Sequence, residues 1–520
     1  MTELDTENVD LVELARGAVP APSWAKVIDQ NRCIGCHACT TACKSENEVP
    51  VGVNRTYVKN VEVGEYPDVR RIFQVTRCNQ CTDAPCVTAC PTSAMFKRAD
   101  GIVDFDKTAC IGCKACMAAC PYDAIFINPD DHSAEKCNFC VHRLDVGLEP
   151  ACVVICPTDA ILVGDLHDPT SLVAAVARDE TTSVRRPGKE TGPNVFYKGG
   201  HQATLDPLGA RRPEGGLFAW SEQPSGPGIA VAGHPDPQGS SAAALLTYDV
   251  GHSVPWDWRV SLYTWTKAIA VGAYLAPLIL ILAGVLGSSS SLWLWAAPTA
   301  ALALLAATGV ILIADLEQPR RFHYLLLRPQ WRSWLVRGAL IITAYGAALV
   351  THLVLSTAGA VDPQKWLAIV GAPLAVAAAV YTAYLFAQAK ARDLWQSQLL
   401  APHMLVQALI AGAAVMVPLA HWLAPGVAAS LEWILMGSVA AHLLLTGVEL
   451  RPAHGTDHAN LAVRELRTGR FAPFLWLSVA LAGAALFAPI IGIAGAVCAL
   501  VALLVYEHAY VQAGQAVPLA

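Results

Sequence analysis

The sequence predicts a chain of two unlike parts, an α+β domain rich in cysteine followed by an all-α domain of eight transmembrane helices. Sixteen of the 17 cysteines lie between Cys33 and Cys156, whereas long apolar stretches dominate from about residue 260. Hydrophobic residues make up 54% of the chain and charged residues only 15%. Since roughly a quarter of an ordinary globular protein is charged, this composition favours a membrane protein that carries a polar domain.

Three zones of composition follow one another along the chain, at 1–165, 166–255 and from about 260, and we expect four segments. The net charge is −6, and without a basic excess no nucleic-acid partner is expected. The opening residues, MTELDTENVD, are acidic and hold no apolar segment of the kind that marks a secretory signal. The expected segments are an N-terminal tail (1–21), the cysteine-rich domain (22–200), a linker rich in Gly and Pro (201–255) and the membrane domain (256–511).

The cysteines fall into four groups of four, and parts of these groups repeat. CIGCHAC (33–39) recurs as CIGCKAC (110–116), and CPTSAMF (90–96) recurs as CPYDAIF (120–126) and CPTDAIL (156–162). The repeats indicate a duplicated unit, a short cysteine loop followed by a strand-like segment. The groups are Cys33, Cys36, Cys39 and Cys43; Cys78, Cys81, Cys86 and Cys90; Cys110, Cys113, Cys116 and Cys120; and Cys137, Cys140, Cys152 and Cys156.

The spacing of these cysteines is typical of cubane iron–sulfur clusters. A C-x2-C-x2-C loop wraps three irons of one cluster, and the cysteine three residues further on ligates the other cluster of a pair. Zinc is one alternative, but zinc sites use two C-x2-C pairs and do not need this run. Disulfides are a second alternative, which the tight spacing and the missing signal disfavour. The pattern therefore predicts four 4Fe–4S clusters that carry electrons.

Residues from about 22 to 200, including RRPGKETGPNVFYKG after the last group, resemble the four-cluster ferredoxin-like subunits of molybdopterin oxidoreductases. These include the subunits of dimethyl-sulfoxide reductase, polysulfide reductase and formate dehydrogenase. The resemblance implies a ferredoxin-like fold with crossed ligation, and because Cys116 stands where some relatives have Trp and a 3Fe–4S cluster, it implies four cubanes. The implied ligand sets are Cys33, Cys36, Cys39 and Cys156; Cys43, Cys137, Cys140 and Cys152; Cys78, Cys81, Cys86 and Cys120; and Cys90, Cys110, Cys113 and Cys116.

Eight apolar stretches follow the linker, and most reach the ~20 residues that a helix needs to cross the hydrocarbon of a bilayer. The alternative is a buried helical core in a soluble protein, but eight such stretches would leave no amphipathic helix for its surface. The predicted helices span 261–286, 291–313, 333–357, 364–388, 399–422, 429–450, 472–489 and 491–511.

Three segments of this region resemble the NrfD-like (polysulfide-reductase) membrane anchor family, over about residues 247–511. They are YDVGHSVPWDWRVSLYTWTKAIAVGAYL (248–275), ADLEQPRRFHYLLLRPQWRSWLVRGAL (314–340) and ARDLWQS (391–397). The resemblance implies eight helices, a quinone or quinol site near the end of the first four helices, and no haem. In the relatives the two parts are separate subunits, whereas here they form one polypeptide.

Ionisable residues at membrane depth are the candidates for the quinone site. Lys267, Tyr263 and Asp315 could supply hydrogen bonds and a proton to the quinone carbonyls. Alternatively, Lys267 extends its charged end to the membrane surface, and Asp315 pairs with Arg320 to lock a loop. The full set of candidates is Tyr263, Lys267, Asp315, Arg320, His323 and Arg337.

Haem would need pairs of histidines from different helices. The five histidines of the apolar region scatter between the two predicted membrane faces, so no haem is expected, and the lone Cys498 is interpreted as a packing residue. The five are His352, His403, His421, His442 and His508.

The loops on the side of the cysteine-rich domain carry ten Lys or Arg residues, and those on the opposite side carry only Lys365. By the positive-inside rule, the cysteine-rich domain lies on the cytoplasmic face of the cell's inner (cytoplasmic) membrane. Alternatively, the basic loops bind the cluster domain, and several family members work on the periplasmic face. The ten residues are Arg320, Arg321, Arg328, Arg332, Lys390, Arg392, Arg451, Arg464, Arg467 and Arg470.

Together these patterns predict an electron-transfer and quinone-reactive subunit of a membrane-bound molybdopterin oxidoreductase. The main catalytic site would lie on another chain, because no part of this one is large enough for a molybdopterin domain. Its partners would be that catalytic subunit, the membrane quinone pool and the lipid bilayer. Two alternatives stay open. One is a hydrogenase or multihaem cytochrome as the partner, and the other is a proton-translocating module that uses Glu449, Asp393 and His442.

Overall fold

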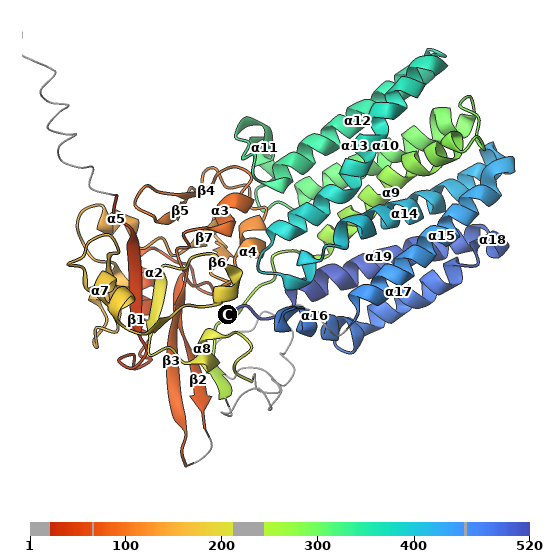
Figure 1. Ribbon diagram of the computed structural model, residues 1–520. Coiled ribbons are helices and arrows are strands. Elements are labelled where there is room, and N and C mark those ends of the chain that lie inside the picture. Colours follow the sequence, from red (N-terminus) through yellow and green to blue (C-terminus); the bar gives the residue numbers. More distant parts are fainter. Residues whose placement is uncertain (1–20, 65–66, 212–243, 452–454) are drawn as a thin grey trace, which may run out of the picture.

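The computed structural model describes residues 21–64, 67–211, 244–451 and 455–520. The cysteine-rich domain lies at one end of a long helical bundle, and the C-terminus lies between the two (Figure 1). The predicted order of an α+β domain followed by a helical membrane domain is confirmed. All but one residue of the predicted tail, and residues 212–243 of the predicted linker, lie outside the described residues.

A mixed sheet in the order β8-β1-β10-β9 forms the base of the cysteine-rich domain. Its central strand β1 pairs in parallel with β10 and antiparallel with β8. The apolar side chains of β1 alternate, so that Ala25 and Val27 pack against Val173 and Val176 of helix α7. The bounds are β1 Trp24–Asp29, β8 Ile161–Asp165, α7 Leu172–Asp179, β9 Thr182–Ser183, η1 Pro187–Lys189 and β10 Val195–Lys198.

Short elements that alternate with the cysteines form the rest of this domain. Each two-stranded hairpin follows a Cys-Pro pair, which agrees with the predicted duplicated unit. The helices are α2 Ala38–Glu46, α3 Pro85–Ala89, α4 Ala115–Ala119, α5 Val141–Leu144 and α6 Ala151–Val154. The strands are β2 Thr56–Val63, β3 Arg70–Arg77, β4 Met95–Lys97, β5 Val103–Phe105, β6 Ile125–Ile127 and β7 Ala134–Lys136.

The described ends of the predicted linker pack on the cysteine-rich domain. Helix α8 (Gln202–Leu205) buries Leu205, and strand β11 (Ala244–Tyr248) pairs antiparallel with β2. The strand could not be inferred from its own composition, because its partner is the edge of a hairpin far away in the sequence. It completes a three-stranded sheet in the order β11-β2-β3.

Within the described residues, seven helices are long and apolar enough to cross a membrane, and an eighth apolar helix, α17, is shorter. The predicted span 472–489 ends early as α17. A one-turn helix, α18, follows, and Gly492 has a positive φ of 56° at the turn into α19. The helices are α9 Trp258–Leu282, η2 Leu292–Ala296, α10 Ala297–Ala314, α12 Trp334–Thr357, α13 Val361–Gln388, α14 Leu400–Leu423, α15 Pro425–Glu449, α17 Ala472–Ala485, α18 Ala488–Ile491 and α19 Ile493–Gln515.

Small residues allow the membrane helices to approach closely. A Cβ added to Gly272 of α9 would lie 1.7 Å from the carbonyl oxygen of Ala408 on α14, and one added to Gly412 would lie 1.9 Å from the carbonyl carbon of Gly272. Only glycine fits at this crossing, as is common between transmembrane helices. Helix α9 is therefore held in the centre of the bundle, where it is the most buried span.

Further elements lie at the end of the bundle that faces the cysteine-rich domain, and the hydropathy of the sequence did not predict them. Among them, α16 is amphipathic and buries Leu461 and Leu466 near the C-terminus (Figure 1). They are η3 Pro319–Arg321, α11 Tyr324–Leu327, η4 Asp393–Gln396 and α16 Asp457–Arg467.

Candidate iron–sulfur and quinone sites

We number the four predicted ligand sets as sites. Site 1 is Cys33, Cys36, Cys39 and Cys156; site 2 is Cys43, Cys137, Cys140 and Cys152; site 3 is Cys78, Cys81, Cys86 and Cys120; and site 4 is Cys90, Cys110, Cys113 and Cys116.

The four cysteines of site 4 line one small cavity. Backbone N–H groups point at its sulfurs. That of Met95 donates to Cys90 Sγ over 3.3 Å, and those of Gly112 and Ala134 donate to Cys110 Sγ over 3.4 Å. Amides arranged in this way suit thiolate ligands, whose negative charge they stabilise.

The four cysteines of site 1 line a second small cavity. The repeated CIGC loop has the same backbone here as in site 4, because Gly35 and Gly112 both have a positive φ, at 70° and 68°. A side chain could not fit at either glycine, since a Cβ at Gly35 would lie 2.3 Å from the Phe73 ring. Site 1 differs from site 4 in reaching the surface, where Cys36 is exposed.

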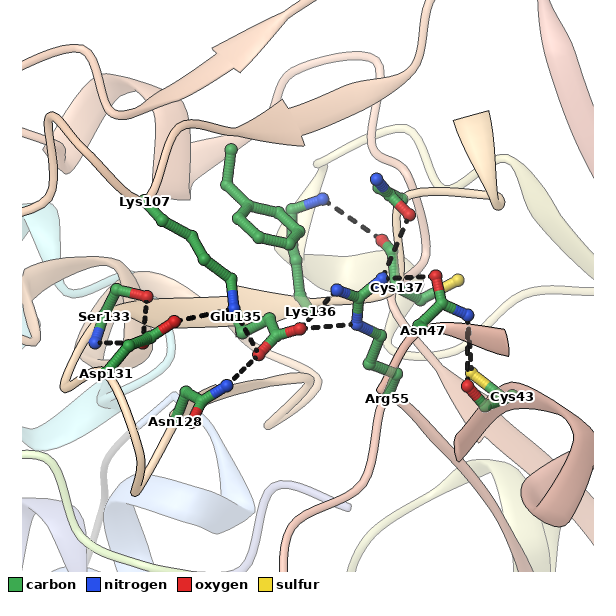
Figure 2. Close-up of polar contacts among 12 residues, drawn as sticks. Cys43, Asn47, Arg55, Lys107, Asn128, Asp131, Ser133, Glu135, Lys136 and Cys137 are labelled. Carbon is green, nitrogen blue, oxygen red and sulfur yellow. Dashed lines mark hydrogen bonds and ion pairs between the residues drawn. The ribbon is translucent and has the colours of Figure 1, made fainter. Parts of the chain in front are cut away.

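The four cysteines of site 2 are all buried, and side chains donate to three of their sulfurs. Lys26 Nζ lies 3.6 Å and Arg77 Nη1 3.1 Å from Cys152 Sγ. The amide of Asn47 lies 3.7 Å from Cys43 Sγ and 3.6 Å from Cys140 Sγ, and Figure 2 shows this amide beside Cys43. Site 2 is therefore lined by more side-chain donors than backbone donors.

The electrostatics of the free thiols differ among these sites. Burial raises the pKa of Cys39 to about 11 and that of Cys43 to about 12. Burial also acts to raise the pKa of Cys152, but the charges of Lys26 and Arg77 outweigh it and lower this pKa to about 7. The thiolate form, which is the form that binds metal, is therefore most favoured at Cys152.

The donor sets fit a multi-iron cluster better than a single ion. Among the described residues, no three Cys, His, Asp or Glu side chains come close enough to hold one metal ion. Each ligand of a cubane binds a different iron, so four cysteines around one cavity, as in sites 1 and 4, suit that group.

The four sites are linked in a row. Cys39 of site 1 and Cys43 of site 2 lie four residues apart on α2, about 6 Å along a helix. Cys86 of site 3 and Cys90 of site 4 have the same separation on α3 and its C-cap. Sites 2 and 3 are connected by Gln80, whose amide donates to the Cys137 carbonyl over 2.7 Å.

Site 4 lies at the junction with the membrane domain. The backbone N–H groups of Glu317 and Gln318 donate to the carbonyls of Gly112 and Ile111 over 3.3 and 3.2 Å. Trp256, just before α9, donates from its indole to the Cys113 carbonyl over 3.3 Å. The loop that holds site 4 is thus bonded directly to the membrane domain.

Tyr263 and Lys267, two of the predicted quinone-site residues, are buried together on α9. Lys267 Nζ donates to the Ala379 carbonyl over 3.1 Å and to Thr382, and it lies 4.5 Å from the centre of the Tyr381 ring. Its amino group therefore points at α13 inside the bundle. The alternative interpretation, in which this group extends to the membrane surface, does not hold.

Of the other four candidates, Asp315 is close enough for its charge to act on Tyr263, whereas Arg320, His323 and Arg337 do not join this pair. Asp315 is buried at the C-cap of α10, where Arg259 Nη1 lies 3.8 Å from it and burial raises its pKa to about 6. Arg320 is exposed. His323 packs edge-on against the neighbouring Tyr324 ring. Arg337 donates to the Trp331 carbonyl over 2.8 Å.

His403, His442, Glu449 and Tyr506 form a buried polar cluster between α14, α15 and α19, and the sequence predicted only part of it. His403 lies 3.1 Å from Glu449 through one ring nitrogen and 2.8 Å from His442 through the other, and Tyr506 donates to Glu449 over 3.0 Å. The sequence pointed to His442 and Glu449, seven residues apart on one face of α15, but not to their link through His403. Asp393, grouped with them from the sequence, pairs instead with Lys189 at the junction.

Comparison with known proteins adds family matches over both parts of the chain. Residues 249–506 match the model described as polysulphide reductase, NrfD. Residues 69–166 match a 4Fe-4S dicluster domain, and residues 24–45 match a 4Fe-4S binding domain.

Relatives of known function share about a third of the chain. A tetrathionate reductase subunit of Salmonella typhimurium is 43% identical over 196 residues, which are 37% of this chain and 78% of that protein. A polysulfide reductase chain of Wolinella succinogenes is 42% identical over 179 residues, 34% of this chain and 94% of that one. The arsenate respiratory reductase iron-sulfur subunit of a Shewanella species is 36% identical over 219 residues, 33% of this chain and 94% of that subunit.

Proposed function

Because the chain is a member of the family of reductase iron–sulfur subunits and carries an NrfD polysulphide reductase domain on the same polypeptide, we propose that it links a molybdopterin-containing catalytic subunit to the quinone pool. Electrons would pass through four 4Fe–4S clusters, one at each site, and would be exchanged with a quinone or quinol in the membrane domain. The cysteines would hold the clusters, and each cluster would take up and release one electron at a time.

The row of four cysteine sites carries this proposal. It starts at the exposed Cys36 and ends at site 4, whose loop is bonded to the membrane domain. Such a row has a surface end for a protein partner and a membrane end for a lipid-soluble carrier. The two cavities with four cysteines each support clusters at both ends.

The surface around site 1 supports docking of a catalytic subunit there. Ile34, between two cysteines of the site, is 57% exposed, and Val154 and Ile155 beside Cys156 are 61% and 47% exposed. Apolar side chains grouped on a surface favour a protein contact. A partner bound here would bring its own redox centre close to site 1.

The membrane end would use the buried pair on α9. Lys267 could donate a proton or a hydrogen bond to a quinone carbonyl, with Tyr263 beside it. Asp315, between Arg259 and the loop of site 4, could exchange protons with water at the junction. Arg320, His323 and Arg337 would then act on the exposed side of that junction.

We place the protein in the inner membrane, with the cluster domain on the cytoplasmic face. At least three of the ten basic loop residues lie against the cluster domain, since Arg321 donates to the Cys110 carbonyl over 2.9 Å, Lys390 lies 3.4 Å from Asp83, and Arg328 shares a hollow with Asp106. Discounting these three leaves seven basic residues against Lys365, which still favours this orientation. Protease should then cut the 201–255 segment in inverted vesicles, and cutting only in right-side-out vesicles would contradict the orientation.

Purification of the native complex tests the proposal. We expect a catalytic chain that contains molybdenum or tungsten to copurify, and quinol to reduce the clusters. Nickel or multiple haems in the copurifying chain would favour the hydrogenase or cytochrome alternative. Lys267→Met should slow reduction by quinol while dithionite still reduces the clusters. Unchanged quinol kinetics would refute the site on α9.

The polar cluster of α14, α15 and α19 supports proton transfer as a second candidate function. His403 joins His442 to Glu449 by short contacts within helices that are mainly apolar. Buried ionisable groups in membrane helices often form proton relays. In proteoliposomes, Glu449→Gln should reduce the protons moved per quinol oxidised, with quinol turnover retained. An unchanged ratio would exclude this function.

A further inference from the structure

At site 2, two buried cationic side chains donate hydrogen bonds to a cysteine sulfur. Lys26 and Arg77 are 0% and 1% exposed, and both donate to Cys152 Sγ, over 3.6 and 3.1 Å. They come from different strands, Lys26 from the centre of β1 and Arg77 from the end of β3. The fold therefore brings two positive charges to one ligand of one site.

No carboxylate neutralises these two cations within the described ranges. The Lys26 ammonium lies 4.3 Å from the centre of the Phe139 ring, and Arg77 Nε and Nη2 have no hydrogen-bond partner. Neither residue takes part in an ion pair there, and both differ in this from Arg55, which pairs with Glu135 close by. Their charges are thus directed at the sulfur.

Asn47 is a third donor at site 2, and the buried ion pair of Arg55 and Glu135 holds it in place. Arg55 bonds Glu135 through one side of its guanidinium and donates from Nη1 to the side-chain oxygen of Asn47 over 2.7 Å (Figure 2). With its oxygen engaged, Asn47 presents its NH₂ group to the sulfurs of Cys43 and Cys140. Arg55 is therefore a positioning residue for a neutral donor.

The other sites have no charged donor of this kind in the part of the chain that the structure describes. Backbone N–H groups donate to the sulfurs of site 4 and to Cys156 of site 1. Lys136, another buried cation, donates to the carbonyls of Val103 and Cys137 and not to a sulfur, so its charge acts on Cys78 and Cys86 of site 3 only from a greater distance. The four sites thus differ in local charge although each holds four cysteines.

We propose that Lys26 and Arg77 give the cluster at site 2 the highest reduction potential of the four, so that the first electron to enter the chain rests there. Reduction adds one negative charge to a cluster, and nearby buried cations stabilise that charge strongly because little water screens them. Hydrogen bonds to sulfur act in the same direction. The proposal rests on the proposed function, that is, on four clusters with these ligands.

A redox titration of the purified full-length chain, followed by EPR, tests this inference. Lys26→Gln and Arg77→Gln should each shift the first signal to appear on reduction to a lower potential. The other signals should shift less, because Arg77 acts on Cys39 of site 1 and Lys26 on Cys78 of site 3 through charge alone, without a hydrogen bond to either sulfur. Arg77→Lys, which keeps the charge, should shift it less, and Asn47→Ala should cause a smaller lowering. Arg185→Gln is the matched control, because Arg185 is equally buried but donates to the Leu519 carbonyl and not to a cysteine.

Two results would overturn the inference. One is a first-reduced signal that does not move in Lys26→Gln, Arg77→Gln or Asn47→Ala. The other is an equal shift in Arg185→Gln. Should Lys26→Gln and Arg77→Gln lose their clusters, Arg77→Lys, which keeps a charge in the interior, decides whether the first signal depends on Arg77. Asn47→Ala, at a partly buried residue, then decides whether that signal belongs to site 2. Fewer than four clusters in the wild-type chain would instead count against the proposed function, whereas four clusters in a different order would refute only this inference.

Discussion

The cluster domain and the membrane domain hold their interiors together in different ways. The cluster domain is made of short strands and helices whose interior contains cysteines and buried charges such as Arg55, Lys26 and Arg77. The membrane domain consists of long helices packed through small residues, as at Gly272 and Gly412. The interior of the cluster domain depends on cysteine ligands and buried charges, and that of the membrane domain depends on close packing of helices. Substitutions in the first should therefore change the clusters, and substitutions in the second should change the stability of the helix bundle.

The largest effect should come from removing a cluster ligand. Cys116→Ser, in the buried loop of site 4, should remove or convert one cluster, because serine is a poor substitute for a thiolate on iron. The EPR spectrum of the reduced chain and its iron content would measure the loss. Cys498→Ser in α19 is the control and should leave all signals intact. A full set of signals in Cys116→Ser would contradict the ligand scheme.

The next largest effect should come from removing a buried ion pair in the cluster domain. Arg55→Met removes the nearer of two cations that pair with the buried Glu135 and leaves Lys107, 3.4 Å away, so the cost should lie below the ~3–5 kcal/mol of a fully broken buried pair. We expect faster loss of iron on heating, followed by the visible absorbance of the clusters. Arg71→Met breaks the exposed pair with Glu62, which contributes about 1 kcal/mol or less. Equal effects in the two variants would show that the Arg55 pair is not structurally important.

A substitution at the crossing of α9 and α14 in the membrane domain should lower the stability less. Gly412→Ala places a methyl group against the backbone of Gly272, and such overpacking costs about 1–3 kcal/mol. The melting temperature in detergent should fall while the reduction potentials stay unchanged. Gly437→Ala is the control, because its methyl group has no atom within 4 Å, and it should not lower the melting temperature. A shift in the cluster potentials of Gly412→Ala would mean that the two interiors are coupled.

The last effect should change with pH over one range, from about 6.5 to about 9, and it concerns the segment that joins the two domains. Burial lowers the pKa of His252, but Asp249 and Asp123 outweigh it and raise this pKa to about 9. A raised pKa stabilises the fold fully below the unfolded value of about 6.5, and that stability is lost as the pH rises through about 9. His252→Gln should therefore melt below wild type near pH 6, and the difference should shrink above pH 9. A constant difference would argue against the charged histidine.

Local patterns predicted part of the site and missed another part for a physical reason. The cysteine spacing and the CIGC repeats depend on a few neighbouring residues, and the structure gives Gly35 and Gly112 the same backbone. The six quinone-site candidates were selected by residue type and depth alone. Tyr263 and Lys267 lie four residues apart on α9, Asp315 acts on Tyr263 through its charge, and the other three lie apart from them. Contacts between helices depend on rotation and crossing, which composition does not specify.

The sequence by itself determined the two-part organisation, the cysteine groups and the approximate limits of the membrane helices, because spacing and hydropathy are properties of neighbouring residues. Only the tertiary structure decided that β11 joins β2, that His403 joins His442 to Glu449, and that Lys26 and Arg77 meet at Cys152. Each of these contacts joins residues that are far apart in the chain, and their proximity follows from how the whole molecule packs.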